Sequence, residues 1–322
     1  MTAKTDRGGQ HRDRQRGVAL ITVLLVFALV AVIAAEMLQR SQLSLRSVGN
    51  LIETRQAYYY ALGGEAYARQ LLAKDVIDGH GDVDTLTEPW AQTADSQPFE
   101  IDDGNMKIEI NDLQGRFNLN SLVGDAQGTT PNPAGVAHFR KLLTVLQLNP
   151  NYAYEWLDWI DRDQVRSSNG AEDADYSGYL TASHPEADIS ALRLLRSMQP
   201  QDYAKLAPHV AVLPVDADEA VTKININTAD ATVLQTIASP TLSAQIVARQ
   251  KTGGYQRVAD AGLSDADASV NSGFFEVIVT VNYAHRWQRV RTVLKRTVDS
   301  AGKVELTVLS RVRRPLIDDI GL

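Results

Sequence analysis

The stretch RQRGVALITVLLVFALVAVIAA, residues 14–35, decides how the rest of the chain is interpreted. Arginines lead up to Gly17, and from Val18 to Ala35 every residue except Thr22 is apolar. A signal peptide has an apolar region of roughly 7–15 residues, whereas a helix that spans a membrane needs roughly 17–25. The run therefore predicts a membrane anchor formed by residues 18–35.

The segment before the apolar run is basic, and this predicts the orientation of the anchor. It carries Lys4, Arg7, Arg12, Arg14 and Arg16 against Asp6 and Asp13. Basic residues beside a spanning helix are retained in the cytoplasm. We therefore expect a single pass, with the N-terminus in the cytoplasm and the C-terminal part on the other side.

The helical pattern does not stop where the membrane should end. Leu38, Leu45, Val48, Ile52 and Leu62 recur at spacings that a helix gathers on one side, and no proline follows before residue 89. The pattern predicts one helix from Val18 to about Leu72, with a length of roughly 80 Å at 1.5 Å per residue.

A basic leader that ends in glycine, followed by an apolar segment and a long amphipathic continuation, resembles the type IV pilin-like proteins. The resemblance implies that a prepilin peptidase cuts between Gly17 and Val18 and methylates the new N-terminus. Most pilins carry a glutamate as fifth mature residue, which pairs with the N-terminal amine of a neighbouring subunit; here that position is Thr22. An unpaired carboxylate is costly in lipid. Thr22 therefore suits a subunit at the end of a filament, and a diverged pilin that tolerates threonine is the alternative.

The composition limits the possible partners. The chain has 322 residues, 44% of them hydrophobic, with a net charge of −7 and no cysteine. A chain of this length can bury more than one core. Without disulfides, an exported fold must be held by packing or by a metal ion. The net acidity argues against nucleic acid as a general partner.

Alternating apolar and polar residues predict strands on both sides of a helical block. FEI and MKIEI flank a DDGN turn at residues 99–110, and three further strand candidates occupy residues 274–283, 288–298 and 304–314. Between them, VAHFRKLLTVLQL, ISALRLLRSM and ADATVLQTIA are predicted helices. We expect an α+β fold in which a large helical domain interrupts a pilin-like antiparallel sheet. The expected divisions are the leader 1–17, the helix 18–72, the first sheet part 73–120, the inserted helical domain 121–271, and the remaining strands and tail 272–322.

Two segments of the helical block have similar openings. FNLNSL, residues 117–122, and ININTA, residues 224–229, each place asparagines two apart before a helix, where they can cap free amides. The second continues into a segment that resembles a DNA-binding helix-hairpin-helix. Its turn, IASPTLSA at residues 237–244, lacks the glycines that let backbone amides approach phosphate, and basic residues nearby are few. We interpret it as a structural or protein-binding hairpin, with DNA binding as the alternative.

The densest chemistry lies in EWLDWIDRDQVRSSNGAEDADYSGY, residues 155–179. Asp158 and Asp161 are three apart and should share one helical face. The remaining carboxylates of the cluster are Asp163, Glu172, Asp173 and Asp175. Hard oxygen ligands on a flexible loop favour calcium over zinc. Counted from Asp161, the spacing approaches that of an EF-hand, but the obligatory glycine is replaced by Arg166. A calcium loop of another type and a solvated acidic loop are the two interpretations.

The motifs LDWIDRD, residues 157–163, and GAEDADY, residues 170–176, resemble the general secretion pathway protein K family, the large minor pseudopilins of type II secretion systems. The resemblance covers essentially the whole mature chain. It implies calcium bound by the six carboxylates Asp158, Asp161, Asp163, Glu172, Asp173 and Asp175. It also implies the missing fifth-position glutamate and an inserted helical domain.

This resemblance implies an assembly protein at the tip of a periplasmic pseudopilus, anchored in the inner membrane with its C-terminal domains in the periplasm. Its expected partners are the minor pseudopilins I and J, the prepilin peptidase and, as further candidates, secreted substrate proteins; nucleic acid is not expected. A tip adhesin of a type IV pilus, or a competence-like pilin with a DNA-binding hairpin, is the alternative.

The motifs of common hydrolases are absent from the sequence. It contains neither G-x-S-x-G nor H-E-x-x-H. Paired carboxylates could serve a glycosidase, but a loop this dense in acids more often binds a cation. We therefore expect a protein that is not an enzyme.

Overall fold

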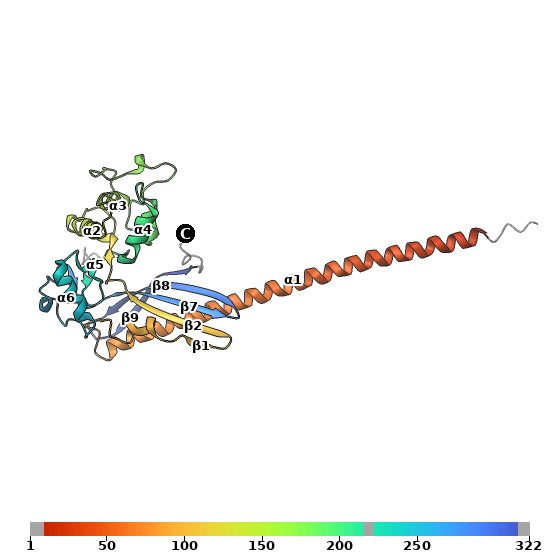
Figure 1. The fold of residues 1–322 in the computed structure, drawn as a ribbon, viewed down its shortest axis with the longest axis horizontal. Helices are drawn as coiled ribbons and strands as arrows, with labels where there is room; N and C mark the ends of the chain where they lie inside the picture. The colour runs from red at the N-terminus through yellow and green to blue at the C-terminus, as the bar shows by residue number, and fades with distance from the viewer. Residues whose placement is uncertain (1–9, 216–221, 315–322) are drawn as a thin grey trace, which may run out of the picture. The chain divides into compact units, whose positions relative to one another are not determined.

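The computed structural model describes residues 10–215 and 222–314, and the chain divides into two compact units, Met1–Gln56 and Ala57–Leu322. Helix α1 (Gln10–Ile77) supplies the first unit and continues into the second (Figure 1). Among the described residues, it alone is long and apolar enough to span a membrane. It extends past the predicted end at Leu72 because no helix breaker occurs before Gly79, which has a φ of +88°.

The last part of α1 packs on the sheet through small side chains. Ala57, Ala61 and Ala68 are fully buried together with Leu72, at spacings that place them on one side of the helix. Gly64 lets the helix come closest, since a Cβ there would lie 2.7 Å from a methyl group of Val279. A glycine costs helix stability, and at this position it has a packing reason.

The sheet has five antiparallel strands in the order β1-β2-β7-β8-β9. Their bounds are β1 (Phe99–Ile101), β2 (Gly104–Asp112), β7 (Phe274–Tyr283), β8 (Arg286–Val298) and β9 (Val304–Arg314). Each coincides with a segment of alternating apolar and polar residues. The predicted α+β class, with a pilin-like long helix and an interrupted antiparallel sheet, is confirmed.

A large insertion separates β2 from β7 and falls into two halves, residues 113–215 and residues 222–273. The first half contains β3 (Phe117–Asn118), η2 (Leu119–Leu122), α2 (Pro133–Val145), α3 (Tyr152–Ile160), η3 (Asp173–Asp175), η4 (Ile189–Leu194), α4 (Pro200–Leu206), η5 (Ala207–His209) and β4 (Val210–Ala211). The second half contains β5 (Ile224–Asn225), α5 (Ala231–Leu234), α6 (Pro240–Gln250), η6 (Val258–Ala261) and β6 (Ala268–Ser269). A further short helix, η1 (Ala91–Asp95), precedes β1.

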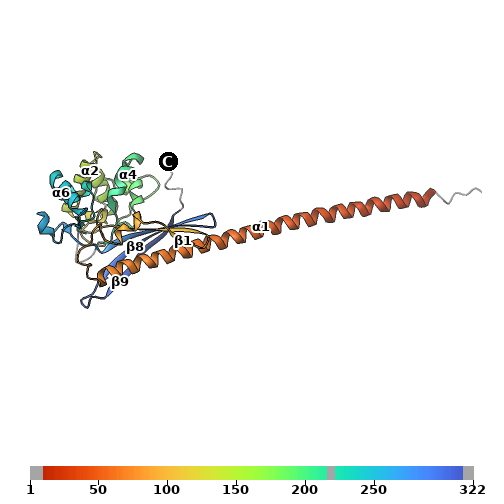
Figure 2. The same cartoon turned by 60° about the horizontal axis from the view of Figure 1, so that its bottom comes forward.

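The insertion and the second-unit part of α1 lie on opposite faces of the sheet (Figures 1 and 2). Each half of the insertion has its own hydrophobic core, around Phe139 and Trp156 in the first half and around Ile226 and Ile246 in the second. The two helices predicted around residues 189 and 231 are shorter than their patterns suggested. One is the 3₁₀ helix η4 and the other is the four-residue α5.

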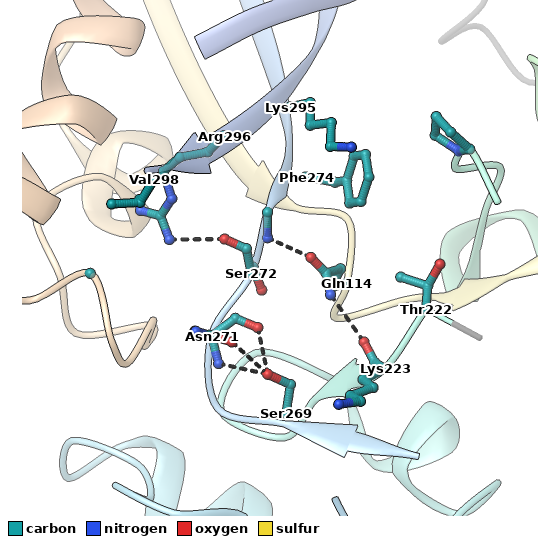
Figure 3. A pocket seen from close by; sticks show the side chains of 13 residues that line it. Gln114, Thr222, Lys223, Ser269, Asn271, Ser272, Phe274, Lys295, Arg296 and Val298 are labelled. Atoms are coloured by element: carbon teal, nitrogen blue, oxygen red, sulfur yellow. Dashed lines mark hydrogen bonds between the residues drawn. The ribbon is translucent and has the colours of Figure 1, made fainter. Parts of the chain in front are cut away.

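The neck of the insertion, where the chain leaves and re-enters the sheet, is closed by a buried polar network. Asp112 ends β2 and accepts hydrogen bonds from Ser272 Oγ at 2.6 Å and from Asn225 Nδ2 at 3.0 Å. Arg296 of β8 donates to the carbonyl of Ser272 at 2.9 Å and to both oxygens of Asp84 at 2.6 Å. Arg296 and Ser272 line a cavity of about 380 Å³ at this neck. Figure 3 shows the side chains around it.

Candidate metal centre

The carboxylate cluster is built where α3 ends and its following loop folds back. α3 buries Trp156 and Trp159 in the core of the first half and stops at Ile160. Asp161 therefore lies beyond the helix in extended conformation, with φ −78° and ψ 162°. The amide of Asp161 still donates to the Leu157 carbonyl at 2.8 Å, so Asp158 lies in the last turn of the helix and Asp161 caps its end.

Three of the six predicted ligands converge. Asp161, Asp163 and Glu172 each offer a carboxylate oxygen, and these oxygens all lie within 4.8 Å of one another. Asp161 and Glu172 are buried, whereas Asp163 is exposed. Oδ1 of Asp161 and both carboxylate oxygens of Glu172 are buried without a hydrogen-bond partner. Buried polar atoms are rarely left unpaired, so these oxygens fit a bound cation.

Asp158 lies beside the three but is already bonded to the loop. Its carboxylate accepts a hydrogen bond from the Ser167 amide at 3.0 Å. A Cβ on Gly170 would lie 1.9 Å from Asp158 Oδ2, so the glycine is what allows the loop to close over this carboxylate. Burial raises the pKa of Asp158.

Asp173 and Asp175 use their oxygens to shape the loop. Asp173 Oδ1 accepts hydrogen bonds from the amide and the hydroxyl of Thr181, at 2.8 and 2.7 Å. Asp175 forms ion pairs with Arg166 and Arg196, and its Oδ2 accepts from the Glu172 amide at 3.1 Å. Asp175 thus holds the backbone of Glu172 in place, Asp173 fixes the loop at Thr181, and neither lies in the converging group.

The electrostatics of the cluster favour a cation. Burial, and then the neighbouring carboxylates Asp158, Asp161 and Asp163, raise the pKa of Glu172 to about 8. Burial and the same repulsion raise the pKa of Asp161 to about 7. A divalent ion would remove the repulsion and satisfy the unpaired oxygens. An all-oxygen donor set of this kind suits calcium.

One contact that holds the cluster was not identified from the sequence. The carbonyl of Gly128 accepts a hydrogen bond from the Arg162 amide at 2.9 Å. Gly128 has a φ of +71°, and a Cβ there would lie 2.6 Å from the carbonyl oxygen of Ile160. The glycine itself was the available signal, but nothing in its sequence neighbourhood connects it to residues 160–162.

A second carboxylate group, Asp75, Asp84 and Glu88, has a similar spacing but different chemistry. Arg296 lies among them and binds Asp75 and Asp84. Glu88 accepts hydrogen bonds from Trp90 Nε1 and the Thr85 amide. A guanidinium thus occupies the place that a metal ion would take.

The predicted processing residues lie within α1. Gly17 and Val18 are both helical. The Thr22 hydroxyl donates to the carbonyl of Val18 at 2.5 Å, so the threonine satisfies its polar group on its own helix.

The helix-hairpin-like segment forms the α5–α6 pair of the second half. Ser239 caps α6 through the Leu242 amide at 3.2 Å. The turn contacts the first half, because Lys141 Nζ donates to the carbonyl of Ala238 at 3.3 Å. The glycine-free turn thus serves packing between the two halves.

Comparisons with known proteins address the identity of the chain. The type II secretion system protein K of Pseudomonas aeruginosa is 35% identical over 320 residues, with 92% of each chain covered. The chain belongs to the type II secretion system protein K family. Its counterpart in Klebsiella pneumoniae is 38% identical over 226 residues, or 67% of each chain. The family model described as "Type II secretion system (T2SS), protein K" matches residues 115–215.

The fold has a solved counterpart. A chain from the GspK-GspI-GspJ complex of the enterotoxigenic Escherichia coli type II secretion system matches with a TM-score of 0.69 and 24% identity. The match covers 83% of this chain and 98% of that one. The expectation of a minor pseudopilin of the protein K family is thereby confirmed, and the alternatives of an adhesin or a competence-like pilin are not favoured.

Proposed function

We propose that this protein K family member caps the tip of a periplasmic pseudopilus and helps to start its assembly for the export of folded proteins. Its resemblance along 92% of the chain to the P. aeruginosa protein is the observation that carries the proposal. The minor pseudopilins I and J would be its partners, in keeping with the GspK-GspI-GspJ assembly of the structural relative. Folded exported proteins would meet the tip.

Two features of the chain support a position at the end of the filament. Thr22 leaves no carboxylate to pair with the N-terminal amine of a neighbouring subunit. The insertion adds two packed cores to one face of the sheet, and this bulk obstructs further stacking above it. The protein acts through assembly contacts and performs no catalysis.

The apolar start of α1 would anchor the protein in the inner membrane, with the N-terminus cytoplasmic and the C-terminal unit periplasmic. A prepilin peptidase would cut between Gly17 and Val18. Intact mass of the membrane-extracted protein tests this, in cells with and without the peptidase. A species that starts at Val18 with one added methyl group, seen only with active peptidase, supports the proposal. A chain that retains residues 1–17 in both would contradict it.

Cysteine cross-linking tests the position at the tip, and the natural absence of cysteine makes single substitutions clean. Val165 in the first half is 75% exposed, and Leu45 in the helix is 70% exposed. We expect V165C to capture no major pseudopilin, while L45C, as the control, captures neighbouring helices. Cross-links from V165C to subunits of the filament shaft would contradict the tip position.

We further propose that Asp161, Asp163 and Glu172 bind calcium, with Asp158 at the edge of the site and Asp173 and Asp175 in support. Calcium supplies positive charge to a buried group of like charges and links the ends of an irregular loop. A ligand that binds the folded state alone raises its stability. A thermal melt of the full chain in detergent should therefore shift upward with calcium and downward with chelator, and an unchanged melting temperature would contradict calcium binding.

A further inference from the structure

The chain that follows the metal cluster runs from the cluster to the sheet and is attached along its way. We call the segment Asp173–Asp188 the strap. It begins next to Glu172, and apart from the single turn of η3 it is irregular. An irregular segment of this length keeps one path only if contacts hold it, and the strap is held at three places.

The first attachment lies beside the metal cluster. Asp173 Oδ1 accepts hydrogen bonds from Thr181, which turns the strap back toward the cluster. The amide of Ser183 then donates to the carbonyl of Trp159 at 3.0 Å. Trp159 lies two residues before Asp161, so the strap and the end of α3 are fastened together next to the candidate ligands.

The second attachment is a clamp made by one buried asparagine. Asn120 is 1% exposed. Its Oδ1 accepts from the Glu186 amide at 3.0 Å, and its Nδ2 donates to the Glu186 carbonyl at 2.8 Å. The indole of Trp159 donates to Glu186 Oε1 at 2.8 Å. Glu186 of the strap therefore contacts both η2, through Asn120, and α3, through Trp159.

The third attachment reaches the sheet. Asp188 Oδ2 lies 3.4 Å from Arg291 Nη1 on β8, and Arg291 also pairs with the buried Glu276 on β7. Asp188 in addition caps η4, by accepting from the Ser190 amide at 2.9 Å. One continuous segment thus connects the carboxylate cluster with the centre of the sheet.

We propose that Asn120 is a positioning residue for the metal site, and that the strap couples ion binding at the site to the contact between the insertion and the sheet. The proposal rests on the calcium binding proposed above. With the strap clamped, Glu172 and Asp161 are held near each other before the ion arrives, and preorganised ligands bind more tightly. Coupling is reciprocal, so the bound ion must in turn hold the strap and its contact with Arg291.

The second half of the insertion supplies a matched control. Asn227 is 0% exposed and clamps Tyr255 in the same way. Its Oδ1 accepts from the Tyr255 amide at 2.7 Å, and its Nδ2 donates to the Tyr255 carbonyl at 2.9 Å. Asn120 Nδ2 also donates to the Leu213 carbonyl at 3.0 Å, and Asn227 Nδ2 also donates to the Val270 carbonyl at 3.4 Å. Asn120→Ala and Asn227→Ala therefore remove equivalent sets of three hydrogen bonds from equally buried sites, and only the first asparagine contacts the strap.

Calorimetric titration of the full chain in detergent with calcium chloride tests the coupling. We expect N120A to weaken calcium binding about tenfold, within the usual range of coupling between sites, and N227A to leave it within about twofold. Asp188→Asn keeps the cap acceptor and removes the charge, so it is a second variant in case N120A fails to fold. We expect D188N to weaken binding about fivefold, at the lower end of that range.

Amide hydrogen exchange gives an independent readout. Calcium should slow exchange at Ser183 and Glu186 and leave Tyr255 unchanged. If N120A, D188N and N227A all bind calcium as tightly as the natural chain, or if N120A and N227A lose affinity equally, the coupling is overturned while calcium binding stands. If the natural chain binds no calcium, both the site and the coupling are overturned.

Discussion

The two halves of the insertion begin with the same short strand and pair of asparagines, but their interiors differ. Each opens with a two-residue strand that pairs in parallel with the strand closing the same half, β3 with β4 and β5 with β6. Asn118 and Asn225 each accept a hydrogen bond from the amide two residues further on, at 3.1 and 3.0 Å. The asparagine at that next position then clamps a distant backbone residue.

The difference lies in how the buried polar groups of each half are hydrogen-bonded. In the second half, the buried Gln250 donates to the carbonyls of Ile226 and Ala229, both at 2.8 Å. Helix α6 thus supplies the hydrogen bonds that these buried carbonyls need. The first half closes over a long irregular loop whose carboxylate oxygens remain unpaired. The same arrangement of asparagines is therefore compatible with a helical hairpin whose buried polar groups are paired and with a loop whose buried carboxylate oxygens have no hydrogen-bond partner.

The two halves also contact the sheet through different residues. The first half reaches it through Asp188 and Arg291, and the second through Ser272 and Arg296. This difference predicts the largest loss of stability. Arg296, Asp84 and Asp75 have side chains at most 5% exposed, so Arg296→Met leaves two buried carboxylates without their cation. We expect a loss of about 3–5 kcal/mol in the free energy of unfolding. Arg291→Met should cost less, about 1–3 kcal/mol, because Glu276 keeps Arg116 at 3.6 Å. Denaturant unfolding followed by tryptophan fluorescence compares them, and equal losses would contradict this ranking of the two contacts.

Glu172→Gln should change stability in opposite directions with and without calcium. At about 100 times the dissociation constant, calcium should stabilise the natural chain by about 2.7 kcal/mol, which corresponds to roughly 5–10 °C in melting temperature. E172Q removes a ligand and should abolish this shift. In chelator it removes the cost of burying an ionisable carboxyl among other carboxylates, and the variant should melt above the natural chain.

Glu155→Gln is the control for this pair of melts. Glu155 is also buried but accepts a hydrogen bond from the Ser197 amide outside the metal cluster. E155Q should keep the full calcium shift. An E172Q protein that still responds to calcium like the natural chain would remove the contrast between the two halves.

The calcium shift should grow as the pH rises. In the ion-free fold the pKa of Glu172 is raised to about 8 and that of Asp161 to about 7. A raised folded-state pKa means that the protonated carboxyl stabilises the ion-free fold fully below about pH 4, and that this contribution is lost as the pH rises through 7 to 8. Calcium requires the ionised forms. Melts at pH 5.5 and 8 should therefore show the larger calcium shift at pH 8, and the reverse order would exclude these carboxylates as ligands.

The smallest predicted effect concerns the contact between the halves. Lys141→Met removes the hydrogen bond to the Ala238 carbonyl at the hairpin turn. Because this side chain is partly solvated, we expect a loss of about 0.5–1 kcal/mol and no change in the calcium shift. A large loss, or a changed response to calcium, would mean that the two halves act as one unit.

Much of this architecture could be predicted from local sequence. Alternation identified all five strands, and the dense carboxylates around residues 158–175 identified the loop that carries the candidate site. Which of those carboxylates converge could not be predicted, because it depends on the end of α3 at Ile160 and on chain reversals near Gly128 and Gly170. The ion pair between Arg296 and Asp84 could not be predicted either, because the two residues lie 212 positions apart and neither belongs to a recognisable motif.

The neck has a consequence for how such a chain could arise. β2 and β7 are antiparallel neighbours, with Asp112 opposite Phe275. The Ser272 hydroxyl and the Asp112 carboxylate, 160 residues apart in the chain, lie 2.6 Å from each other. From the viewpoint of the sheet, the insertion is the loop of a β-hairpin, and the entropy of closing a loop rises only slowly with its length. A simpler pilin could therefore have acquired the whole insertion at one hairpin turn without a new strand order, and a chain with a short turn in its place should still form the five-stranded sheet.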